Sequence, residues 1–118
     1  GQIPPEAMPY FFRNIDVLVV ASTNSTEAFG MVQVEAMFEG TPVVATDLPG
    51  VRVPIKVTGY GDIAKIADSE DLAKKIILTL KQNHKVDTNK IRKIFSKENA
   101  IKSYIDIYKS LIHEKQTD

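Results

Sequence analysis

Two short apolar runs with a helical segment between them are the strongest constraint that this sequence places on its fold. Residues 15–22 (IDVLVVAS) and 41–47 (TPVVATD) are rich in β-branched side chains and bounded by polar ones, which is typical of strands buried on both faces. Residues 30–39 have helical periodicity, and Gly40 suits the position just past a helix end. This order predicts a βαβ unit with parallel strands and a right-handed crossover.

The rest of the chain extends this unit. Residues 61–66 form a third candidate strand. Helices are expected in four places: over 9–14, over 70–82 with Ser69 as N-cap, and in two C-terminal segments capped by Thr88 and Ser96. The 118 residues fit one domain. The predicted fold class is therefore α/β, a Rossmann-like open parallel sheet of about three strands with flanking helices.

The last predicted helix carries an apolar stripe at spacings of three and four residues. Its members are Ile101, Tyr104, Ile105, Tyr108, Leu111 and Ile112. Such a stripe usually packs on the rest of a protein, and we expect that here. Lysines crowd between Lys81 and Lys109, where a solvated helix surface and an anion-binding surface both remain open.

Composition excludes several classes of function. The 15 basic and 15 acidic residues balance, so no net field attracts the chain to nucleic acid. The absence of cysteine excludes disulfides, thiolate metal sites and a cysteine nucleophile. No apolar run is long enough to span a bilayer, and residues 1–12 lack the order of a secretion signal. We therefore expect a cytoplasmic protein.

Two glutamates stand in the otherwise apolar region around the first predicted helix. On a helical projection, Glu35 falls beside Met31 and Phe38 on a helix that apolar residues nearly encircle. A carboxylate buried there would be costly unless it is hydrogen-bonded. Two interpretations remain open: Glu35 lies at the helix edge with Glu39 and reaches water or a distant lysine, or it accepts hydrogen bonds from ligand hydroxyls such as those of a ribose.

Glu27 precedes the same helix, in the loop that follows the first strand. Ligands of open α/β sheets bind beyond the carboxyl ends of the strands, near the helix N-termini. The alternative is a purely local interaction of Glu27 with the helix dipole or as a cap. Gly30 would let a ligand approach the backbone, and the first-turn N–H groups can bind an anion. A phosphate-bearing ligand with hydroxyl groups fits this pattern.

The sequence E-A-F-G-M-V-Q-V-E-A-M, followed by G-T-P-V-V-A-T-D-L-P-G, resembles the signature of the GT-B glycosyltransferases, specifically the family-four (group 1) retaining enzymes. FFRNIDVLVVAS is similar to the strand that leads into the family's donor site, and VTGYGDIAKIADSEDLAKKI to its Thr-Gly segment and following helix. FSKENAIKSYIDIYKSLI resembles the closing helix that crosses back to the other domain. The resemblance covers nearly the whole chain.

This resemblance implies a nucleotide-sugar donor, an acceptor of unknown class, and no cofactor or metal. By position, Glu27 is the catalytic candidate, which contacts donor-sugar hydroxyls and either aids departure of the leaving group or stabilises the developing sugar cation. The implied donor-binding residues are Glu35 at the ribose, Phe29 and Gly30 at the sugar, Met31 and Val32 at the diphosphate, and Ile3 at the base. Two alternatives remain: a sugar-nucleotide epimerase of the same fold, and a non-catalytic βαβ binding module.

The chain also departs from the family pattern. The acceptor domain, three earlier strands and the Arg and Lys that clamp the diphosphate are not seen, so residues 1–118 are expected to be the C-terminal portion of the donor domain. Val53 stands where many members have Glu, and Ala21 replaces a frequent Pro. We expect the fragment alone to be inactive and to self-associate through the uncovered edge of the 15–22 strand. Peripheral attachment to the cytoplasmic face of the membrane is a further expectation.

Overall fold

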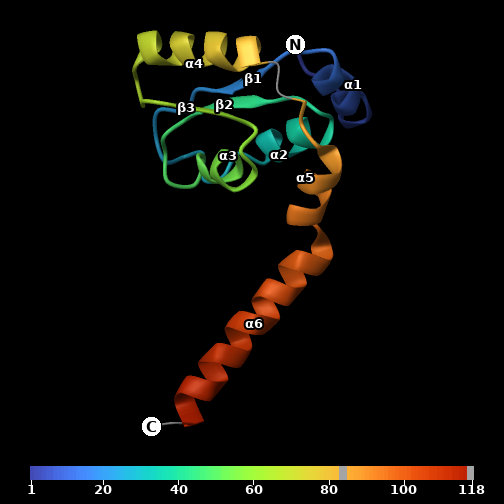
Figure 1. Cartoon of the computed structure of the whole chain (residues 1–118), viewed down its shortest axis with the longest axis vertical. Helices are drawn as coiled ribbons and strands as arrows, with labels where there is room; N and C mark the ends of the chain where they lie inside the picture. The colour runs from blue at the N-terminus through green and yellow to red at the C-terminus, as the bar shows by residue number, and fades with distance from the viewer. Residues whose placement is uncertain (83–84, 117–118) are drawn as a thin grey trace.

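The computed structural model describes residues 1–82 and 85–116 and contains a small sheet, covering helices and one projecting helix (Figure 1). The elements in chain order are η1 (Pro5–Ala7), α1 (Met8–Arg13), β1 (Leu18–Val20), α2 (Met31–Phe38), β2 (Val43–Thr46), α3 (Val53–Thr58), β3 (Gly61–Ala64), α4 (Ser69–Gln82), α5 (Thr88–Ile94) and α6 (Lys97–Gln116). In this described part, no helix is long and apolar enough to cross a membrane.

The sheet is parallel, with strand order β1-β2-β3. Val19 pairs with Val44, and Val44 pairs with Asp62. Helix α4 packs on β2 and β3 from one side, while α2 and α3 lie on the other side of the sheet (Figure 1). The predicted α/β class, the βαβ unit and the third strand are therefore confirmed.

The two strands of the βαβ unit differ in burial. All four residues of β2 are buried, as expected for a strand covered on both faces. In contrast, β1 is only three residues long, and Val19 is 36% exposed. The prediction of a longer strand buried on both faces is wrong for β1, because β1 lies at the sheet edge while α4 packs on the other two strands.

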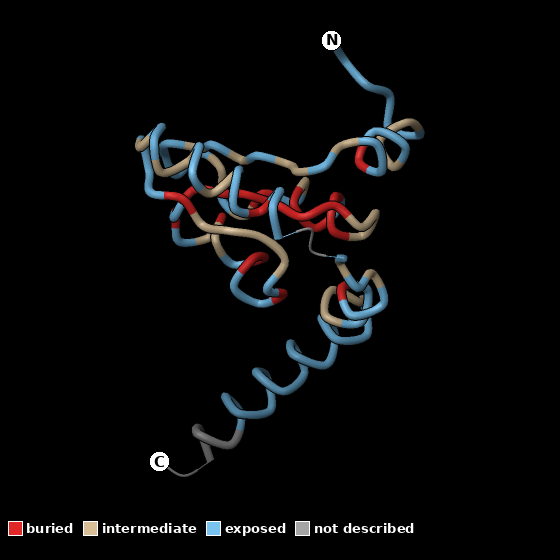
Figure 2. The backbone as a smooth tube through the Cα atoms, turned by 45° about the horizontal axis from the view of Figure 1, so that its top comes forward, coloured by how far each residue is buried: buried red, intermediate tan, exposed pale blue. Residues whose placement is uncertain are grey.

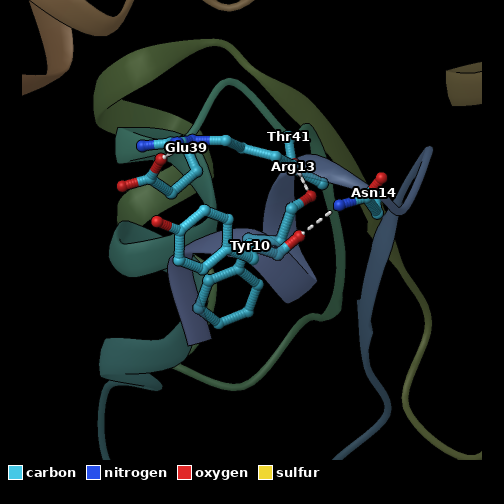
Figure 3. A network of polar contacts seen from close by, with 6 residues as sticks. Tyr10, Arg13, Asn14, Glu39 and Thr41 are labelled. Atoms are coloured by element: carbon cyan, nitrogen blue, oxygen red, sulfur yellow. Dashed lines mark hydrogen bonds and ion pairs between the residues drawn. The ribbon is translucent and has the colours of Figure 1, made fainter. Parts of the chain in front are cut away.

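The hydrophobic core lies between the sheet and helices α1, α2, α3 and α5. Its buried members include Phe12, Met37, Val43, Ala45, Val51, Ile55 and Ile91. Helix α1 is also held by polar contacts (Figure 3): Arg13 pairs with Glu39 at the end of α2, and the Thr41 hydroxyl donates to the Phe12 carbonyl over 2.6 Å. These two contacts tie the end of α1 to the end of α2 and to the residue that precedes β2 by two positions.

Aspartates cap two of the C-terminal helices. The Asp68 carboxylate accepts from the Asp71 N–H at 2.9 Å, and Asp87 accepts from the N–H groups of two residues in the first turn of α5. The predicted caps Ser69 and Thr88 are therefore wrong by one residue, because each follows an aspartate that reaches the free N–H groups first. The predicted cap Ser96 is confirmed, since its hydroxyl accepts from the Asn99 N–H at 3.1 Å.

Helix α6 extends away from the sheet (Figures 1 and 2). Every side chain described in it, from residue 97 to residue 112, is exposed, including Tyr104 at 65% and Ile112 at 58%. The expectation that its apolar stripe packs on the rest of the chain is wrong. The reason is geometric: the helix leaves the compact part of the molecule, so no other described segment lies opposite the stripe.

Candidate functional site

Two loops meet at the carboxyl ends of the parallel strands. Residues 21–30 follow β1 and residues 47–52 follow β2. The Thr46 hydroxyl donates to the Ser22 carbonyl over 2.6 Å, which joins the ends of the two strands. At Gly50, a methyl group would lie 1.6 Å from the Ala28 carbonyl oxygen, so only glycine permits this approach of the two loops. Open α/β sheets bind ligands at these carboxyl ends of the strands.

Glu27 closes the turn that leads into α2. Its side chain is half-buried, and Oε1 accepts a hydrogen bond from the Gly30 N–H at 2.9 Å. Glu27 therefore makes the local contact at the start of α2 that the sequence analysis gave as one alternative. Within the described residues, Oε2 has no hydrogen-bond partner, so one carboxylate oxygen is still able to accept from a ligand.

Gly30 begins α2 in the left-handed conformation, with φ 73° and ψ 63°. Its carbonyl accepts from the Gln33 N–H at 2.9 Å, which starts the helix. The N–H groups of Met31 and Val32 donate no hydrogen bond to any residue in the described part of the chain. Two adjacent unpaired N–H groups at a helix N-terminus can bind an anion. These are the two residues that the family resemblance assigned to a diphosphate.

Glu35 lies on the exposed side of α2. The buried side of the helix consists of Gln33, Val34, Ala36 and Met37, whereas Met31 is 61% exposed. The expectation that apolar residues nearly encircle the helix around Glu35 is wrong, because the side of the helix that carries Met31 is open to solvent. Glu35 therefore reaches water in this structure, and its role as an acceptor for ribose hydroxyls stays a prediction. Its carboxylate has no partner among the described residues.

A shallow apolar pocket of about 260 Å³ lies beside Glu35. Its other lining residues are Pro5, Met8, Pro9, Phe12, Phe38 and Glu39, from η1, α1 and α2. Ile3 is 37% exposed and lies in the segment just before η1. Ile3 therefore lies two residues before Pro5 in the sequence and is not part of the lining.

Gln33 is the site residue that the sequence reading missed. It is fully buried on α2, and its Nε2 donates to the Phe29 carbonyl at 3.1 Å and to the Val51 carbonyl at 2.8 Å. The signal was present in the sequence as a polar residue on a helix face that is otherwise apolar. Phe29 itself is half-buried, with its ring edge-on to the Phe95 ring at 6.5 Å.

Positive charge is scarce in this region. Arg52 is the one basic residue in the two loops, and its Nη1 pairs with the Asp47 carboxylate at 2.9 Å. No group of three potential metal-ligating side chains occurs within the described residues. The electrostatic attraction that these loops offer to a phosphate therefore comes chiefly from the backbone of α2.

Comparison with known proteins agrees with this geometry. Residues 1–102 match the family described as "Glycosyl transferases group 1". A phosphatidyl-myo-inositol mannosyltransferase of Mycobacterium leprae is 34% identical over 70% of this chain and 22% of its own length. A D-inositol 3-phosphate glycosyltransferase of Geodermatophilus obscurus is 32% identical over 95% of this chain and 26% of its own length, and one of Corynebacterium jeikeium is 43% identical over 58% and 15%.

The chain thus spans about a quarter or less of the length of these relatives. The family match covers the sheet, both loops and the whole of α2, which carries the two glutamates and the unpaired N–H groups. The parallel three-stranded sheet with flanking helices is that of part of a GT-B C-terminal domain. The chain belongs to the group 1 glycosyltransferases.

Proposed function

We propose that this chain forms part of the donor-binding domain of a retaining glycosyltransferase and holds a nucleotide sugar at the carboxyl edge of its sheet. The observation that carries the proposal is the pair of unpaired N–H groups of Met31 and Val32, next to Glu27. A diphosphate would accept hydrogen bonds from these N–H groups. The backbone of Phe29 and Gly30 would then face the sugar.

Glu27 is proposed to act on the donor sugar through Oε2. Its Oε1 is occupied by the Gly30 N–H, so the turn holds the carboxylate in place before a donor binds. The transition state of glycosyl transfer resembles an oxocarbenium ion, and a fixed negative charge beside it lowers its free energy. Oε2 would also accept from a sugar hydroxyl in the bound donor.

Glu35 is proposed to accept hydrogen bonds from the ribose hydroxyls. Its exposure and lack of a described partner leave the carboxylate free for this role. The adjacent pocket offers the apolar surfaces of Met8, Pro9 and Phe38 to a planar base. Ile3, at the start of the segment that leads to this pocket, would contact the base through its backbone.

The fragment alone is proposed to be inactive. The charge of a leaving nucleoside diphosphate needs preorganised donors, and removal of one typically costs ~10²–10³ in rate. In these two loops the one basic residue, Arg52, is paired with Asp47, so the loops offer no free cation for the leaving diphosphate. In the intact protein we propose a cytoplasmic location at the membrane's inner face, supported by the lipid in the name of the M. leprae relative.

The test is titration of the intact protein with UDP-glucose, GDP-mannose and ADP-glucose, comparing Glu35→Ala and Glu27→Ala with Glu98→Ala. E35A should raise the dissociation constant for the donor about tenfold or more, because it removes a charged hydrogen bond to the ribose. E27A should lower the turnover number by about 10²-fold with a smaller change in affinity. E98A removes an exposed carboxylate of α6 and should match the parent. Parental binding and turnover in both E35A and E27A would refute the assigned roles.

A further inference from the structure

Gln33 joins the two loops that wall the proposed donor site. It is 0% exposed, and its side chain reaches from α2 to a carbonyl in each loop: that of Phe29, after β1, and that of Val51, after β2. We propose that Gln33 is a positioning residue, whose carboxamide holds both loops in the register that directs the Met31 and Val32 N–H groups toward a diphosphate. This inference rests on the proposed function.

The orientation of the carboxamide follows from its partners. Both partners are carbonyl oxygens, which only accept, so the nitrogen of the amide must face them and both of its N–H bonds are used. The amide oxygen, Oε1, is buried and has no partner among the described residues. An apolar side chain of similar size would avoid that buried acceptor, but it would leave the two carbonyls unpaired. Glutamine therefore contributes two N–H groups, one for each loop carbonyl.

The position of Gly30 also depends on Gln33. A methyl group at Gly30 would lie 2.7 Å from Nε2, so the carboxamide fills the space beneath the left-handed residue that starts α2. Gly30 in turn donates its N–H to Glu27. The carboxamide therefore supports both the start of the helix and the turn that holds the Glu27 carboxylate.

A second contact joins the same two loops independently of Gln33. The Ala28 carbonyl oxygen lies where a methyl group at Gly50 would be, so the loops touch directly through backbone atoms. The register of the loops is thus set at two points, Gln33 and Gly50. A perturbation at either point should affect donor binding through the same displacement.

The experiment compares Gln33→Met, Gly50→Ala and their combination with Val34→Ala in the intact protein. Methionine keeps the length of the side chain but removes both N–H donors. Val34 is 2% exposed on the same helix, and V34A lowers stability without touching either loop carbonyl. For each variant, the melting temperature and the dissociation constants for UDP-glucose, GDP-mannose and ADP-glucose are measured.

We expect Q33M to weaken binding of the donor that the parent binds by about tenfold or more, while V34A at a similar melting temperature stays within about twofold. The loss of donor affinity in the double variant should be smaller than the product of the losses in the two single variants. Both substitutions displace the same pair of loops, so their effects should not be independent. Equal donor affinity in Q33M and V34A, or multiplicative losses in the double variant, would overturn the positioning role alone. A parent that binds none of the three donors would overturn the proposed function and this role with it.

Discussion

Helices α2 and α6 both carry apolar residues at helical spacing, yet one is built into the core and the other stands free. Helix α2 has eight residues, packs against the sheet and α5, and buries Val34, Ala36 and Met37. Helix α6 has twenty residues and leaves every side chain described in it exposed. An apolar stripe therefore indicates which side of a helix can be buried, but a partner surface decides whether it is buried.

The largest difference expected between the two helices is in stability. Met37→Ala removes a fully buried core side chain and should lower the free energy of unfolding by about 2–5 kcal/mol. Ile105→Ala, on exposed α6, should change it by less than about 0.5 kcal/mol. Urea denaturation of the 118-residue chain, followed by circular dichroism, measures both. A similar loss in I105A would show that α6 folds back onto the compact part in solution.

A smaller effect concerns how α2 begins. Gly30→Ala should destabilise the chain by about 1–3 kcal/mol more than Gly59→Ala, because both residues have a left-handed φ, but only at Gly30 would the new methyl group meet another side chain. Thermal denaturation gives the difference between the two variants. If G30A and G59A are equally destabilising, Gln33 moves aside without cost and the packing beneath Gly30 does not constrain the helix start.

The smallest expected effect is on self-association, which should depend on the exposed strand β1 and not on the exposed helix α6. We propose that the isolated chain self-associates through the open edge of β1 at tens of micromolar. Val19→Lys should then reduce the sedimentation coefficient, because a charge on an edge strand disfavours strand pairing. Ile105→Lys should leave it unchanged. A monomeric parent, or loss of association only in I105K, would contradict association through β1.

Much of the fold could be predicted from the sequence because its signals are local. The apolar runs around Val19 and Val44 and the glycine after α2 were sufficient for the βαβ unit. The ends of helices were predicted less well, since Asp68 and Asp87 compete with the next residue for the same N–H groups. Those choices depend on the backbone geometry at each helix start, which the residue type alone does not fix.

The candidate site was predicted in part for the same reason. Glu27 and the first turn of α2 are neighbours in sequence, so their meeting required no tertiary information. The burial of Gln33 and the exposure of Glu35 depend on which side of α2 faces the sheet and the loop after β2. The helical projection found apolar residues nearly all round α2, so it did not separate the buried side from the exposed one.

By itself, the sequence determined the order of strands and helices, the family, and the segment that carries the glutamates, because these follow from local propensity, periodicity and short motifs. Only the tertiary structure decided that Gln33 joins the two loops, that Glu35 faces outward, and that α6 has no partner within the described chain. The physical reason is that burial and hydrogen bonding between distant segments depend on which surfaces meet. A residue's own neighbours in sequence do not specify that.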